Sequence, residues 1–159
     1  MGENDRTLDQ AWDTALRLLA RRGHTMRELE EKLRRRGFEP QTSATVVSKC
    51  EKLKYIDDEA SGRAYLNELL EKGYGPFKIR RALAKKGLGE ILICDLFDEA
   101  GVEEREMDLC REVLQKKLKT ASKKTDPEKR KVRLYRFLLS RGFSGSVACD
   151  LLGECELNK

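Results

Sequence analysis

Apolar residues recur along this chain with the spacing of amphipathic helices, and one stretch of this pattern occurs three times. In each copy, three residues separate an apolar residue from a glycine, and a further apolar residue follows the glycine directly. The copies begin 50 and then 55 residues apart. They are Leu29…Leu33-Arg-Arg-Arg-Gly37-Phe38, Ile79…Leu83-Ala-Lys-Lys-Gly87-Leu88 and Leu134…Leu138-Leu-Ser-Arg-Gly142-Phe143. Self-similarity over so many positions indicates a repeat protein.

The first copy lies in a segment that predicts three helices. Trp12, Ala15, Leu16 and Leu19 are spaced i, i+3, i+4 and i+7, which places them on one helical face. Gly23 is expected to end this helix in a left-handed conformation.

The next two helices of this segment have clear start signals. Thr25 and Glu28 form a capping box that opens a helix from residue 26 to 36, and Gly37 closes it. Pro40 is suited to the first turn of a third helix, which runs to about Leu53.

The same plan continues along the chain. Asp57 and Asp58 are natural N-caps, Pro76 and Pro127 suit first helical turns, and no stretch alternates as a strand would. Further helices are predicted over 57–72, from Pro76, over 90–100, along the stripe from Met107 to Leu118, over 127–140 and over 144–152.

These helices predict an all-α protein of three tandem three-helix repeats, because each small repeat must bury its apolar face against a neighbour. We expect an elongated, curved array of right-handed helices. The predicted boundaries are a flexible N-terminus at 1–7, repeats at 8–56, 57–101 and 102–153, a lysine-rich loop at 119–125 within the third repeat, and a tail at 154–159.

Composition predicts a basic protein with reduced cysteines that is not secreted. The 159 residues are 39% apolar and 38% charged, with a net charge of +5. Residues 116–136 hold ten basic and two acidic side chains. The start of the chain lacks a signal peptide, and no apolar stretch is long enough to span a membrane. The five cysteines have no CxxC spacing and suit reduced, buried thiols. We therefore expect a cytoplasmic protein.

Candidate chemistry is sparse. The one histidine, His24, lies between a glycine and a capping threonine, which predicts a solvated turn residue. The run Asp57-Asp58-Glu59 could hold Mg²⁺, but helix capping is the favoured interpretation. Nucleotide-binding and zinc motifs are missing from the sequence. We expect no catalytic residue, no metal and no cofactor, so the protein is not expected to be an enzyme.

Basic residues recur on the second helix of each repeat. Lys78, Arg81 and Lys85 share one helical face. Such a run is often only a solvated face, but its recurrence in all three repeats favours an electropositive track. Long bidentate donors such as Arg63 suit phosphates and carboxylates alike, so these residues leave the acceptor open.

The central repeat resembles the RecX family of bacterial regulatory proteins. The resemblance rests on Lys54-Tyr-Ile-Asp-Asp58, on Arg63-Ala-Tyr65 and on Gly73-Tyr-Gly-Pro76-Phe-Lys-Ile79-Arg80. The outer repeats also fit, so the similarity extends from about residue 11 to 152. It implies tandem three-helix repeats that bind the RecA recombinase, chiefly its filament on single-stranded DNA, limit filament growth, and lower ATP hydrolysis, strand exchange and repressor self-cleavage.

Charge and motif position together predict the residues that contact the partner, and the protein is expected to act as a monomer. The predicted residues are Arg34, Arg35, Arg36, Arg63, Lys72, Gly75, Lys78, Arg80, Arg81, Lys85, Lys129, Arg130 and Arg133. Two alternatives stay open. One is a basic helical protein that binds DNA weakly and without sequence preference, because the helices offer few Asn or Gln side chains for base readout. The other is a scaffold for an unrelated acidic partner.

Overall fold

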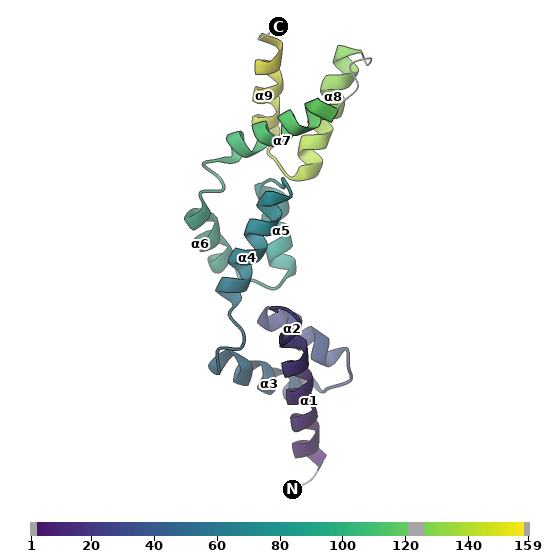
Figure 1. The fold of residues 1–159 in the computed structure, drawn as a ribbon, viewed down its shortest axis with the longest axis vertical. Helices are drawn as coiled ribbons and strands as arrows, with labels where there is room; N and C mark the ends of the chain where they lie inside the picture. The colour runs from purple at the N-terminus through teal and green to yellow at the C-terminus, as the bar shows by residue number, and fades with distance from the viewer. Residues whose placement is uncertain (1–2, 121–125, 158–159) are drawn as a thin grey trace. The chain divides into compact units, whose positions relative to one another are not determined.

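The computed structural model describes residues 3–120 and 126–157, and this part of the chain forms nine helices and no strand (Figure 1). The helices are α1 (Glu3–Leu19), α2 (Met26–Arg34), α3 (Pro40–Lys52), α4 (Asp58–Glu71), α5 (Pro76–Lys85), α6 (Glu90–Ala100), α7 (Glu106–Thr120), α8 (Pro127–Arg141) and α9 (Gly145–Leu157). The predicted all-α repeat fold is confirmed. Most of the predicted lysine-rich loop lies outside the described residues.

The chain divides into two compact units. The first unit comprises residues 1–65 and 83–93, and the second comprises residues 66–82 and 94–159. Helices α4, α5 and α6 each contribute residues to both units.

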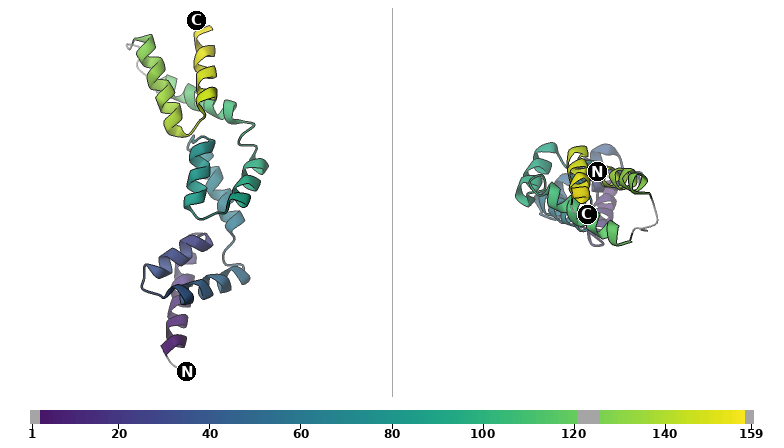
Figure 2. Two further views of the ribbon diagram at one scale, coloured as in Figure 1. Left: turned by 180° about the vertical axis from the view of Figure 1, so that it is seen from behind. Right: turned by 90° about the horizontal axis from the view of Figure 1, so that it is seen from above.

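Each unit contains a three-helix core. In the first unit, α1, α2 and α3 pack around buried Leu29, Leu33, Val46 and Cys50. In the second unit, α7 runs across α8 and α9 (Figure 2), and the three helices enclose Cys110, Leu138, Phe143 and Leu151. These cores fix the second helix of the first and third repeats, on which much of the predicted surface lies.

Most predicted helix starts are confirmed, but α2 ends two residues before the predicted residue 36 and α9 runs five residues beyond the predicted residue 152. The capping box of Thr25 and Glu28 is present, and Pro40 and Pro127 lie in the first turns of their helices. Gly37 has a φ of 90° at the end of the second helix of its repeat. The expectation for Gly23 was wrong, because this residue is not among those with positive φ.

The N-terminus of α2 contacts the C-terminus of α5 in the first unit. The Thr25 hydroxyl donates a hydrogen bond of 2.6 Å to the Lys86 carbonyl. The Lys86 ammonium in turn donates to Glu28 at 2.7 Å. The Met26 N–H at the start of α2 donates to Asp58 Oδ1 at 2.8 Å. Helix donors that would otherwise lack a partner are therefore satisfied by the next repeat.

A corresponding contact in the second unit joins the N-terminus of α5 to the C-terminus of α8. The Gly75 N–H donates to the Arg141 carbonyl at 2.9 Å, and the Phe77 N–H donates to the Gly142 carbonyl at 3.0 Å. We call these two contacts, one in each unit, the helix-end junctions. In both, a negative helix C-terminus meets a positive helix N-terminus, which is the favourable orientation of the two dipoles.

Glycine permits the close approach at the junction of the second unit. A Cβ atom on Gly142 would lie 2.4 Å from Lys78 Cβ and 2.5 Å from Lys78 N. A Cβ atom on Gly75 would lie 2.6 Å from the carbonyl carbon of Gly142. Gly37 occupies the same place in the first repeat as Gly142 does in the third, yet nothing lies within 4 Å of its Cβ position.

His24 is buried next to the junction of the first unit, so the expectation of a solvated turn residue was wrong. Its side chain is 2% exposed. His24 Nε2 lies 2.6 Å from the Lys32 ammonium, and Nδ1 lies 2.8 Å from the Arg22 carbonyl. An ammonium can only donate, so Nε2 accepts and Nδ1 carries the proton. The imidazole is therefore neutral in this arrangement.

The charge state of His24 follows from this environment. Burial lowers the pKa of His24, and the charges of Lys32 and Arg22 lower it further, against the opposing effect of the hydrogen bond to the Arg22 carbonyl. Burial also lowers the pKa of Lys32. In the unfolded chain His24 takes up a proton near its ordinary pKa of about 6.5. Stability should therefore fall as the pH drops below that value.

The first prediction compares two equivalent glycines. Gly37→Ala should lower the free energy of unfolding by about 1–2 kcal/mol, the cost of a left-handed residue with a Cβ atom. Gly142→Ala carries the same cost plus about 1–3 kcal/mol for overpacking against Lys78. Urea denaturation of both variants measures the difference. Equal losses of stability would show that the junction does not require a glycine.

The second prediction concerns the pH dependence of stability. Wild-type protein should lose stability between about pH 7 and 5.5, where unfolded but not folded His24 binds a proton. His24→Gln keeps an acceptor for Lys32 and does not titrate, so its profile should be flatter over this range. Urea denaturation at a series of pH values gives both profiles, and His24 is the chain's only histidine. Parallel profiles would contradict the assignment.

Candidate partner-binding surface

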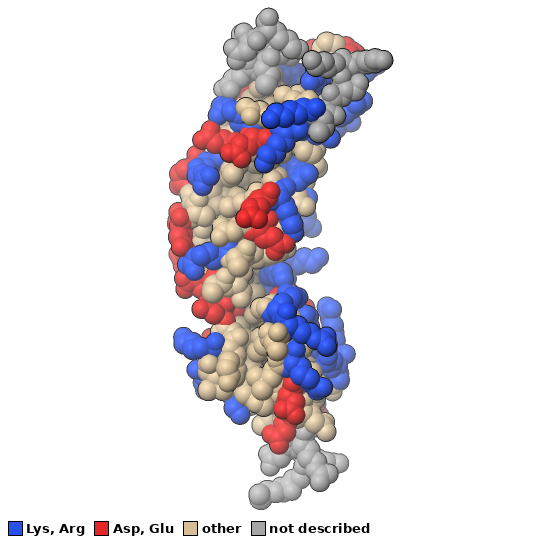
Figure 3. Space-filling view, viewed as in Figure 1, with Lys and Arg blue, Asp and Glu red and all other residues tan. Residues whose placement is uncertain are grey.

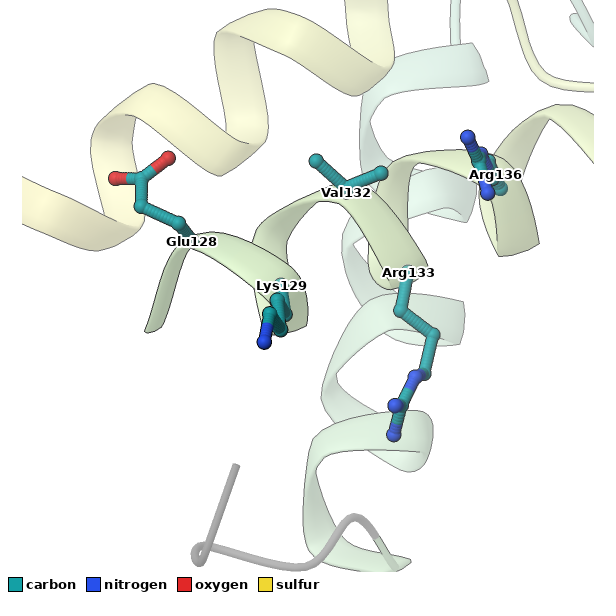
Figure 4. A pocket seen from close by; sticks show the side chains of 5 residues that line it. All are labelled: Glu128, Lys129, Val132, Arg133 and Arg136. Carbon is teal, nitrogen blue, oxygen red and sulfur yellow. The ribbon is translucent and has the colours of Figure 1, made fainter. Parts of the chain in front are cut away.

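One face of α8 carries a row of basic side chains around a shallow hollow. Figure 4 shows the residues that line it, with Lys129 and Arg133 projecting to the same side of the helix. Lys129, Val132, Arg133 and Arg136 are spaced i, i+3, i+4 and i+7, which places them on one helical face. The three basic residues are exposed. A helix with such a face presents closely spaced positive charge to solvent.

The row reaches α5 through the junction of the second unit. Ser140 lies four residues after Arg136, and its carbonyl accepts a hydrogen bond of 3.2 Å from the Lys78 ammonium. Lys78 is also 4.2 Å from the centroid of the Tyr74 ring. Arg81 follows Lys78 by three positions and is exposed. We define the basic stripe as Lys129, Arg133 and Arg136 of α8 with Lys78 and Arg81 of α5.

The basic stripe includes four of the predicted contact residues, and it adds Arg136. Within the described part of the chain, none of its five members forms an ion pair with a carboxylate. Glu128 also lines the hollow on α8, but among the residues that the structure describes it forms no ion pair with these cations.

Exposed apolar side chains accompany the stripe. Phe77 is 66% exposed beside Lys78, Val132 is 48% exposed, and Leu139 is 40% exposed. Val132 and Leu139 are seven positions apart and so share a face of α8. Large apolar groups among arginines are typical of protein–protein contact surfaces, in which aromatic and arginine side chains often supply most of the affinity.

Other predicted contact residues of the second unit have different surroundings. Arg80 donates to Glu103 at 3.0 Å and lies 4.6 Å from the centroid of the Phe97 ring. Lys72 is paired with Glu68, and Arg130 is half-buried. Gly75 is buried in the junction, where its N–H is used. Arg80 and Gly75 are therefore engaged in contacts within the second unit.

The predicted contact residues of the first unit do not form one row. Arg34, Arg35 and Arg36 are exposed at the end of α2, and Arg35 lies 3.7 Å from Glu31. Arg63 is paired with Glu59 at 2.8 Å, and Lys85 is exposed in the last turn of α5.

The cysteines and acidic residues offer no evident reactive centre in the described residues. Cys50 and Cys110 are buried free thiols, whereas Cys149 is exposed. Burial and the charge of Glu106 raise the pKa of the Cys110 thiol to about 12, so it stays protonated. Within the described ranges no cluster of three His, Cys, Asp or Glu side chains could hold a metal ion. No described helix is long and apolar enough to cross a membrane.

Comparison with known proteins gives consistent matches. Residues 11–50 match the family model for the first three-helix domain of RecX, and residues 103–152 match the model for its third three-helix domain. The chain is 37% identical over 134 residues to the regulatory protein RecX of Chlorobaculum tepidum, covering 84% of this chain and 80% of that protein. It is 31% identical over 147 residues to the regulatory protein RecX of Legionella pneumophila (strain Corby), covering 92% and 95%.

Solved structures agree with the fold. The crystal structure of RecX from Lactobacillus salivarius superposes with a TM-score of 0.71 at 22% identity, covering 96% of this chain and 99% of that one. A second crystal structure of regulatory protein RecX gives a TM-score of 0.80 at 22% identity, covering 93% and 73%. On the family models and the sequence relatives together, the chain belongs to the RecX family of regulatory proteins.

Proposed function

We propose that this protein binds the RecA recombinase and its filament on single-stranded DNA, and that it does so through the basic stripe. Binding would limit filament growth and lower ATP hydrolysis and strand exchange, which would modulate recombinational repair and the SOS response. Family membership supports a regulatory role. The observation that carries the proposal is the basic stripe itself, with its exposed apolar neighbours.

The chemistry of the stripe suits a large acidic surface. Its five cations are drawn from two helices and have no carboxylate partner among the described residues. Closely spaced like charges raise the on-rate for an oppositely charged partner. Phe77 and Leu139 then add apolar area that becomes favourable only when a partner excludes water from it. A filament of protein on DNA can present both negatively charged groups and apolar patches to such a surface.

The alternative is a basic protein that binds naked DNA without sequence preference. The same cations could contact phosphates, and that binding would weaken steeply with salt. The exposed Phe77 and Leu139 favour the protein partner, because apolar contacts persist when salt screens the charges.

The third prediction tests the stripe on its target. Arg81→Ala with Arg133→Ala should weaken inhibition of RecA ATP hydrolysis on single-stranded DNA roughly twofold to thirtyfold, because two charged contacts of about 0.2–1 kcal/mol each are lost. Both side chains are exposed, so the thermal unfolding of the variant should match that of the wild type. The assay titrates each protein into a fixed amount of RecA and DNA at low and moderate salt.

A matched control removes the same charge elsewhere. Arg21→Ala with Lys52→Ala alters two exposed residues of the first unit and should leave inhibition unchanged. Equal inhibition by the wild type and the Arg81/Arg133 variant would count against the basic stripe. Inhibition that vanishes at moderate salt and follows coverage of naked DNA would favour the alternative.

A further inference from the structure

A small cavity in the second unit lies among the end of α4, the middle of α7 and the end of α8. Its volume is about 240 Å³. Four cations and one acid are among the side chains that line it: Glu71, Lys72, Gly73, Val113, Lys116, Lys117, Phe137 and Arg141. These residues come from three segments that are distant in sequence, so the folded unit itself brings the charges together. None of the four cations belongs to the basic stripe.

Glycine allows the wall of the cavity to form. Gly73 has a φ of 72°, and a Cβ atom there would lie 2.9 Å from Val113 Cγ2. A side chain at this position would push α7 away from the end of α4. The glycine therefore sets the spacing that brings Lys116 and Lys117 of α7 near Lys72.

Arg141 is held in place at the rim. One of its terminal nitrogens donates to the Lys72 carbonyl at 2.8 Å. Its guanidinium carbon lies 5.3 Å from the centroids of both the Tyr74 and the Phe137 rings. A guanidinium has five N–H donors, so this anchoring leaves others to face a ligand. Holding the group by aromatic contacts lowers the entropy that it would lose on binding.

Lys72, Lys116, Lys117 and Arg141 outnumber Glu71, the one acid among the lining residues, so positive charge is in excess around the cavity. Lys116 is exposed and has no hydrogen bond or ion pair within the described part of the chain. Lys117 places its ammonium 5.1 Å from the centroid of the Phe137 ring. Lys72 is paired with Glu68, but the four lining cations still outnumber Glu68 and Glu71 together. Figure 3 shows basic side chains gathered over α7 and α8 in the same unit.

We propose that this cavity binds a phosphate group. A volume below the roughly 300–1,000 Å³ of drug-sized ligand sites suits a small anion rather than a large ligand. Arginine with its planar fork and clustered lysines are the groups that recognise phosphate oxygens. The phosphate could belong to a nucleic-acid strand or to a free nucleotide. This inference goes beyond the proposed function and does not depend on RecA.

The fourth prediction tests the cavity without RecA. Lys116→Gln with Lys117→Gln removes two exposed charges, and thermal unfolding of the variant checks that it stays folded. The variant should bind a labelled oligothymidylate about tenfold more weakly by fluorescence anisotropy. The slope of log affinity against log salt should fall by roughly 1.4, about 0.7 for each lost phosphate contact. Binding of pyrophosphate, measured by calorimetry, should be lost in parallel.

A control variant with the same net charge defines the background. Arg21→Gln with Lys52→Gln removes two exposed charges of the first unit. Loss of oligonucleotide affinity alone would identify the strand phosphate as the ligand, and loss of pyrophosphate binding alone would identify a free nucleotide phosphate. If the Lys116/Lys117 variant matches this control with both probes, the proposal is overturned. That outcome would leave the RecA assay, which uses other residues, unaffected.

Discussion

The hydrogen bonds at the helix-end junctions are the constraint on which much of this structure depends. In the first unit the Lys86 carbonyl at the end of α5 accepts from Thr25 at the start of α2. In the second unit the Arg141 carbonyl at the end of α8 accepts from Gly75 at the start of α5. A helix leaves its last carbonyls and first N–H groups unpaired. The second junction pairs the two sets directly, whereas in the first the Thr25 hydroxyl and the Asp58 carboxylate supply the partners. A short three-helix repeat thus obtains from its neighbour the partners that it cannot supply itself.

The two junctions solve the same problem with different residues. Gly75-Pro76 lets backbone meet backbone, because glycine permits the approach and proline has no N–H that needs a partner. The first unit has Thr25-Met26 at the corresponding place, so the Met26 N–H must be capped, and Asp58 accepts from it at 2.8 Å. Burial raises the pKa of Asp58, against the hydrogen bond from Met26, which lowers it. Burial would also raise the pKa of Glu28, but Lys86, Arg22 and the Thr25 N–H together hold it below its ordinary value.

Local signals in the sequence predicted the helices well because caps, prolines and apolar spacing act over a few residues. The capping box at Thr25 and the helix start at Pro127 needed no knowledge of distant contacts. His24 was misjudged because its partner Lys32 and its burial arise from packing, whereas its neighbours resemble a turn. The charge runs predicted basic helices, but they could not show that Arg80 pairs with Glu103, 23 residues away. Nor could they show the cavity around Arg141, whose lining comes from three separate segments.

The junction of the second unit also explains how the basic stripe can extend over two helices. Where a helix C-terminus faces a helix N-terminus, their opposite partial charges largely cancel. The electrostatic potential at the junction is then determined mainly by the charged side chains. With Gly142 between them, Lys78 approaches closely enough to donate to the Ser140 carbonyl. A bulkier residue at position 142 would separate Lys78 from α8 and divide the stripe into two smaller groups of charge. Because attraction to a partner grows when like charges are close together, the same glycine that serves the fold also shapes the proposed binding surface.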